Sequence, residues 1–129
     1  MSVRAEWLLP PVPAVLEQAL EGLVGVDRWL LARGLVPCLY RSGVRYRWKL
    51  PGTGWDHAGI VVKRGSGDCK DVASWRVAEL REQGVDARPY VVHTGGRNYH
   101  VVVRYPDGII EDPSRVLIVG ERRARARQG

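Results

Sequence analysis

The sequence predicts a single α+β domain, and three observations support this prediction. Apolar residues recur every three or four positions between residues 13 and 33, as one face of an amphipathic helix requires. A second helical pattern runs from Cys69 to Gln83 and stops at Gly84. Three short strand-like segments separated by tight turns follow it, and a helix followed by an antiparallel meander is typical of the α+β class. The length of 129 residues is that of one domain.

The first half of the chain contains one predicted helix and one predicted strand. A proline-rich segment at residues 9–13 leads into the first helix, and Gly34 is expected to end it. Apolar and basic residues then alternate over residues 44–50, which indicates a half-buried strand or an extended arm before the turn at 51–54. Cys38 has apolar neighbours and is expected in the core.

The second half of the chain contains the predicted meander. Strands are expected at residues 87–93, 99–105 and 109–112, with turns at 94–97 and 106–108. The two turns are short, so consecutive strands are expected to pair in antiparallel fashion.

The charge of the chain is concentrated at its C-terminal end. The formal net charge is +6, and the last residues carry a basic run formed by Arg122, Arg123, Arg125 and Arg127. We therefore expect a domain at residues 1–120 and a basic, flexible tail at 121–129. Such a tail could contact nucleic acid or an acidic protein face, although it lacks aromatic residues for base stacking.

Composition also excludes several classes of protein. No apolar run is long enough to cross a bilayer, and the N-terminal residues lack the features of a secretory signal peptide, so a cytoplasmic location without membrane contact is expected. Two cysteines are too few for a disulfide framework. The Cys, His and Asp residues offer no local pair with metal-ligand spacing, so neither a metal nor another cofactor is expected.

Three residues in the second half could form a nucleophilic site. Cys69 is placed at the start of a helix, where the helix dipole stabilises a thiolate and the backbone N–H can hold an oxyanion. His100 lies in a valine-rich strand and could act as the base. Asp112 follows one hairpin later on a neighbouring strand, within reach of His100 if the register permits it. His57 and His93 are expected to be surface or structural residues, with His57 as a spare base.

Each of these residues also has a purely structural alternative. Cys69 could be a buried inert thiol, and His100 could be a hydrogen-bonded core residue. Asp112 could cap the turn that it forms with Pro113. For Asp68 an N-cap role at the second helix is favoured over a catalytic one.

The order of these elements resembles the catalytic core of the transglutaminase-like cysteine proteins, whose fold is papain-like. The resemblance covers about residues 65–116 and depends on Gly67-Asp68-Cys69, the helix end at 80–88, His100, and Asp112-Pro113. It implies a nucleophile, a general base and acid, and an orienting carboxylate, in that order: Cys69, His100 and Asp112. A nucleophile at a helix N-terminus packed on a small antiparallel sheet is the fold that the resemblance implies.

The chain also departs from the pattern of the family. Val101 and Val102 follow His100, whereas larger members have a small residue and a tryptophan there. The aromatic residue that shapes the oxyanion site is not evident, so Trp48 and Trp55 are candidates for the oxyanion site or the substrate groove, as is Asp68.

Taken together, the residues and the resemblance predict a cysteine-dependent acyl-transfer enzyme that acts on a protein or peptide. Hydrolysis of a peptide, isopeptide or amide bond is favoured over cross-linking, because no residue pattern indicates an amine site. The compact pattern around Asp112 is similar to that of small bacteriophage and prophage proteins. The alternative function is therefore a non-catalytic module of a phage virion, or another interaction module, that keeps the same fold.

Overall fold

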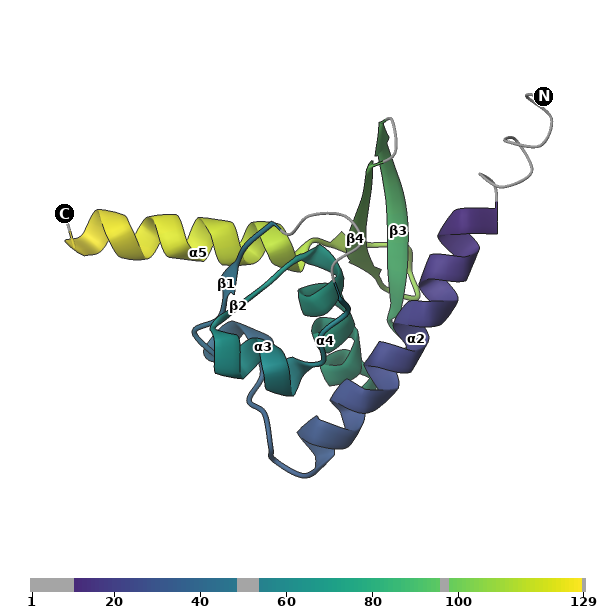
Figure 1. Cartoon of the computed structure of the whole chain (residues 1–129), viewed down its shortest axis with the longest axis horizontal. Helices are drawn as coiled ribbons and strands as arrows, with labels where there is room; N and C mark the ends of the chain where they lie inside the picture. The colour runs from purple at the N-terminus through teal and green to yellow at the C-terminus, as the bar shows by residue number, and fades with distance from the viewer. Residues whose placement is uncertain (1–10, 49–53, 96–97, 129) are drawn as a thin grey trace.

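The computed structural model describes residues 11–48, 54–95 and 98–128 (Figure 1). It is a mixed α+β structure, as predicted, with a three-stranded antiparallel sheet and a separate two-stranded parallel pair. None of the helices within these ranges is both long and apolar enough to cross a membrane.

The other helices pack against one central helix, α4. The bounds are α2 Pro11–Ala32, α3 Ala58–Arg64, α4 Cys69–Glu82 and α5 Pro113–Gln128, with a short 3₁₀ helix at Leu39–Arg41. The patterns that predicted helices at 13–33 and 69–83 correspond to α2 and α4. The short helix α3 was not predicted, because seven residues give too little periodicity to detect.

The strands form two small sheets. The antiparallel sheet has the order β3-β4-β5, with bounds β3 Arg88–Gly95, β4 Asn98–Arg104 and β5 Ile110–Glu111. The second sheet pairs β1 (Arg45–Tyr46) with β2 (Ser66–Gly67) in parallel. The strand predicted at 44–50 is thus only two residues long, and its last two positions lie outside the described residues.

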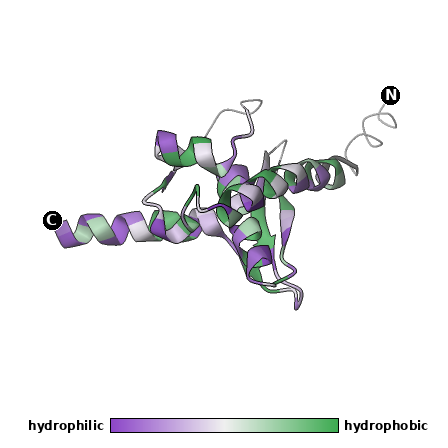
Figure 2. Cartoon of the chain, turned by 90° about the horizontal axis from the view of Figure 1, so that it is seen from below, coloured by the Kyte–Doolittle hydropathy of each residue, from purple (hydrophilic) through white to green (hydrophobic). Residues whose placement is uncertain are grey.

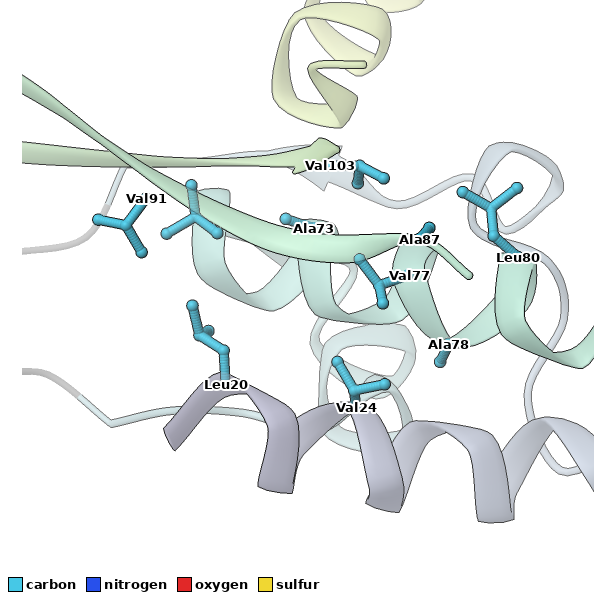
Figure 3. Packing of buried hydrophobic residues seen from close by; sticks show 10 residues of the cluster. Leu20, Val24, Ala73, Val77, Ala78, Leu80, Ala87, Val91 and Val103 are labelled. Atoms are coloured by element: carbon cyan, nitrogen blue, oxygen red, sulfur yellow. The ribbon is translucent and has the colours of Figure 1, made fainter. Parts of the chain in front are cut away.

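Side chains from α2, α4 and the antiparallel sheet form the main core. Figure 3 shows Leu20 and Val24 of α2 pointing towards α4 and the sheet. They belong to a buried cluster with Val77 of α4 and Val103 of β4, which are both fully buried. Burial of a large apolar side chain contributes about 1.5–3 kcal/mol, so this cluster holds α4 in a defined position against the sheet.

Trp75 anchors the other face of α4. It is fully buried in a second cluster with Leu39 and Val61, and its indole Nε1 donates a hydrogen bond to the Pro37 carbonyl oxygen at 3.1 Å. This cluster connects α4 with α3 and the segment that leads into β1.

The prediction that Cys38 lies in the core is wrong, because the structure exposes this residue. The next residue, Leu39, occupies the buried position instead, and its backbone N–H donates to the Glu79 carboxylate. Apolar neighbours on both sides do not distinguish which residue of such a segment faces inward.

Residues 121–128, for which the sequence predicted a flexible tail, are helical and form the end of α5. Arginine, alanine and glutamine are good helix formers, and the Glu121 carboxylate accepts from Arg125 Nη2 at 2.7 Å, an i,i+4 pair. Figure 1 shows this part of α5 extending away from the rest of the molecule, and Figure 2 shows that it carries mostly hydrophilic residues.

Candidate active site

Cys69 is the first residue of helix α4, directly after the N-cap Asp68. The Asp68 carboxylate accepts a hydrogen bond from the Asp71 N–H at 3.2 Å. The Asp71 carboxylate accepts one from the Asp68 N–H at 3.1 Å. This capping box is the N-cap role that the sequence favoured for Asp68. It holds the first turn of α4, and with it the Cys69 backbone, in a fixed orientation.

The parallel pair β1–β2 holds the segment that leads into Cys69. The Arg47 N–H donates to the Gly67 carbonyl oxygen at 2.9 Å, and the pairing places Tyr46 opposite Gly67. A Cβ at Gly67 would lie 3.0 Å from Val61 Cγ1 and 3.2 Å from Asp71 Cβ. Glycine thus allows this close approach between α3, the start of α4 and the strand before it, whereas a larger residue would push the Val61 and Asp71 side chains aside.

His100 and Asp112 come together through the register of β4 and β5. The ladder pairs Val103 with Glu111, so its continuation would set Asp112 opposite Val102. His100 is two positions along β4 from Val102 and shares its face, which makes His100 and Asp112 diagonal neighbours. Their side chains meet, with His100 Nε2 2.9 Å from Asp112 Oδ2.

The His100 imidazole contacts Cys69 as well as Asp112. The hydrogen bond to Asp112 and then the one to the Cys69 side chain raise the pKa of His100 to about 10. The side chain of His100 is 28% exposed, and its burial opposes the shift without cancelling it. His100 is thus an imidazolium at neutral pH, placed between a carboxylate and a sulfur.

Asp112 is suited to hold this charged imidazole. Partial burial would raise the pKa of Asp112, but the hydrogen bond and charge of His100 outweigh that effect and lower it. Asp112 also accepts a hydrogen bond from the Arg115 N–H at 3.4 Å, at the start of α5. Asp112 therefore fits both alternatives drawn from the sequence, because it caps a turn of backbone and also orients His100.

Tyr46 is a residue of the site that the sequence analysis missed. Burial is the largest cause of its raised pKa, with Cys69, Asp68 and Asp112 adding to the effect, and Tyr46 shares a pocket lining with His100 and Asp112. Tyr46 lies within the alternating segment at 44–50, so the pattern contained the residue. Only the parallel pairing with β2, which no local pattern indicates, brings it beside Cys69.

Of the other residues that the sequence singled out, the two tryptophans are exposed and the two histidines make local contacts. Trp48 and Trp55 are 67% and 39% exposed, and neither is among the residues that line a pocket beside His100 and Asp112. His57 caps α3, with Nδ1 accepting from the Gly59 N–H at 3.1 Å. His93 packs against Tyr99 with ring centroids 5.2 Å apart.

A surface pocket of about 330 Å³ opens beside His100 and Asp112. Tyr46 forms part of its lining, and residues of α5 complete it: Ser114, Arg115, Ile118, Val119 and Arg122. Within the described ranges, no group of three or more His, Cys, Asp and Glu side chains could hold a metal ion.

Thus an imidazolium and a carboxylate line this pocket, and the helix-start cysteine contacts the same imidazole. This arrangement can support attack by sulfur on a carbonyl carbon, with proton transfer by the imidazole. No family model matches this chain, and no curated protein and no solved structure is similar enough to count as a match.

Proposed function

We propose that this protein is a cysteine-dependent acyl-transfer enzyme with a transglutaminase-like, papain-like core. The observation that carries the proposal is the position of the His100 imidazole, which contacts both the Cys69 side chain and Asp112 while Cys69 begins α4. Cys69 would be the nucleophile, His100 the proton donor and acceptor, and Asp112 the carboxylate that orients His100.

In the first step, the Cys69 sulfur attacks the carbonyl carbon of an amide or ester. The tetrahedral oxyanion would be held by the backbone N–H of Cys69, which as the first residue of α4 has no partner within the helix. The C–N or C–O bond then breaks, and the leaving amine or alcohol takes its proton from the His100 imidazolium. The products of this step are a thioester on Cys69 and a neutral imidazole.

In the second step, the neutral His100 accepts a proton from water as the water oxygen attacks the thioester carbon. The C–S bond breaks, the carboxylic acid departs, and the thiolate and imidazolium are restored. We favour water over an amine as the acceptor because His100 is 28% exposed, which gives solvent access to the imidazole. The proposed reaction is hydrolysis of a peptide, isopeptide or amide bond.

Competitive alkylation of the two thiols tests this proposal. Iodoacetamide near pH 6 is expected to modify Cys69 faster than Cys38, because a nearby imidazolium and a helix N-terminus stabilise an anionic sulfur. Cys38 is the more exposed of the two cysteine residues, so accessibility alone would favour the opposite order. Peptide mapping by mass spectrometry gives both rates in the same sample.

Two variants provide the controls for this experiment. His100→Ala should slow alkylation of Cys69 at least tenfold while leaving the rate at Cys38 unchanged. His93→Ala removes a histidine from the neighbouring strand and should change neither rate. Equal alkylation rates at both thiols in the folded wild-type protein would contradict an activated nucleophile and would favour a non-catalytic module. The function of such a module should be unaffected by Cys69→Ala.

A further inference from the structure

The wall that α5 contributes to the pocket beside His100 is positively charged. Arg115 and Arg122 are seven positions apart, which is about two turns, so both lie on one face of the helix. Ile118 lies between them and gives this face an apolar surface. The pocket thus combines two guanidinium groups with an apolar strip, next to the imidazole of the proposed nucleophilic site.

These two guanidinium groups have no anionic partner in the described part of the chain. No ion pair involves Arg115 or Arg122 there, whereas Glu121, on the same helix, pairs with Arg45, Arg47 and Arg125. The carboxylate Asp112 lines the pocket too, but its charge is balanced by the His100 imidazolium at 2.9 Å. The net charge of the pocket lining is therefore positive.

From this arrangement we infer that the pocket binds a carboxylate of the substrate, close to the bond that is cleaved. This inference rests on the proposed acyl-transfer function and narrows its substrate class. A guanidinium group binds a carboxylate through paired N–H donors, and the apolar strip suits the short methylene stem of an aspartate or glutamate side chain. The substrate is thus a peptide or amide with an acidic residue beside the scissile bond.

Thiol-reactive probes test the pocket independently of catalysis. β-Maleimidopropionic acid and its neutral amide differ only in the carboxylate, and Cys38 serves as the internal reference. Two partly exposed ion pairs predict a preference of Cys69 for the acid of roughly five- to tenfold relative to Cys38. The preference should decline as salt rises to about 0.5 M.

A matched pair of charge variants separates the pocket from the net charge of the helix. In the double variant Arg115→Gln, Arg122→Gln, Cys69 should react with the acid and the amide probe at nearly the same rate relative to Cys38. Arg123→Gln with Arg127→Gln removes the same charge from α5 positions that do not line the pocket, and should keep the preference. All four side chains are exposed, so both variants should retain the far-UV circular dichroism of the wild type. Equal loss in both variants, or no preference in the wild type, would overturn the inference.

Two pairs of ester substrates then locate the carboxylate. The hydrolysis rates of para-nitrophenyl hemisuccinate and para-nitrophenyl butyrate are compared to test for a carboxylate on the acyl side of the bond. The rates of para-carboxyphenyl butyrate and its methyl ester are compared to test for a carboxylate on the leaving-group side. In one of the two pairs, the acidic ester should be hydrolysed faster than the neutral one. This difference in rate should disappear in the Arg115/Arg122 double variant and persist in the Arg123/Arg127 double variant. Equal hydrolysis rates within both pairs would overturn the carboxylate site but would leave the acyl-transfer proposal standing.

The failure of the proposed function would look different. If no ester acylates Cys69, the acyl-transfer proposal fails. The proposed acidic substrate then fails with it, even if Cys69 still prefers the acidic maleimide. Duplex DNA that blocks the maleimide reaction at micromolar concentration, with no preference for the acid probe, would instead assign the arginines to nucleic acid and would overturn the carboxylate site.

Discussion

His100 is the residue whose charge state matters most for the proposed acyl transfer. Asp112 is the largest cause of its raised pKa, so Asp112→Asn should lower the pKa of His100 from about 10 towards 6.5. Cys69→Ala should lower it less, since the contact with Cys69 is the second cause. An NMR titration of the imidazole protons measures both values. A pKa of His100 that is the same in Asp112→Asn and in the wild type would contradict the hydrogen bond at 2.9 Å.

The same shift has a consequence for the stability of the fold. The pKa of His100 is higher in the folded state than in the unfolded chain, so its ion pair contributes stability that is complete below about pH 6.5. This contribution is lost as the pH rises through about 10. The difference in unfolding free energy between the wild type and Asp112→Asn should therefore shrink over that interval.

At the scale of the element, the capping box of α4 connects stability with reactivity. Asp68→Ala removes the acceptor for the Asp71 N–H and should cost about 1 kcal/mol in the free energy of unfolding, measured with urea. Fraying of the first turn should also slow alkylation of Cys69. Asp68→Asn keeps an acceptor oxygen and should retain most of the stability. An alanine variant as stable as the wild type would show that the box does not hold the helix start.

At the scale of the whole molecule, one buried carboxyl connects α2 with α3 and lies within reach of a like charge on α4. Asp27 of α2 is fully buried, and its Oδ1 accepts from the Ala58 N–H of α3 at 2.7 Å. Within the described residues its Oδ2 is buried without a hydrogen-bond partner. Burial, opposed by that hydrogen bond and assisted by the charge of Asp71 in α4, raises the pKa of Asp27 to about 7.

This carboxyl should make the stability of the whole protein depend on pH. The folded state holds a proton on Asp27 that the unfolded chain releases near pH 4, so unfolding free energy should fall as the pH rises from about 4 to 7. The loss should be at most about 4 kcal/mol. Asp27→Asn stays neutral and should remove this part of the dependence, as urea unfolding at several pH values would show. Parallel stability profiles for the variant and the wild type would contradict a protonated Asp27.

The sequence by itself determined the features that depend on local patterns. The α+β class, the positions of α2 and α4, and the N-cap Asp68 follow from apolar periodicity and helix-end chemistry, which neighbouring residues control. The order of Cys69, His100 and Asp112 in a helix and a meander also made their meeting an expectation. The register of β4 and β5 then decided that His100 and Asp112 touch.

Only the tertiary structure decided which distant segments surround that site. The parallel pairing of β1 with β2 puts Tyr46 beside Cys69, and the path of α5 puts Arg115 and Arg122 along the pocket. The exposure of Cys38 and the burial of Asp27 depend likewise on what packs against them. The physical reason is that periodicity reports only that a residue belongs to a face, whereas its neighbours on that face come from other parts of the chain and are chosen by packing.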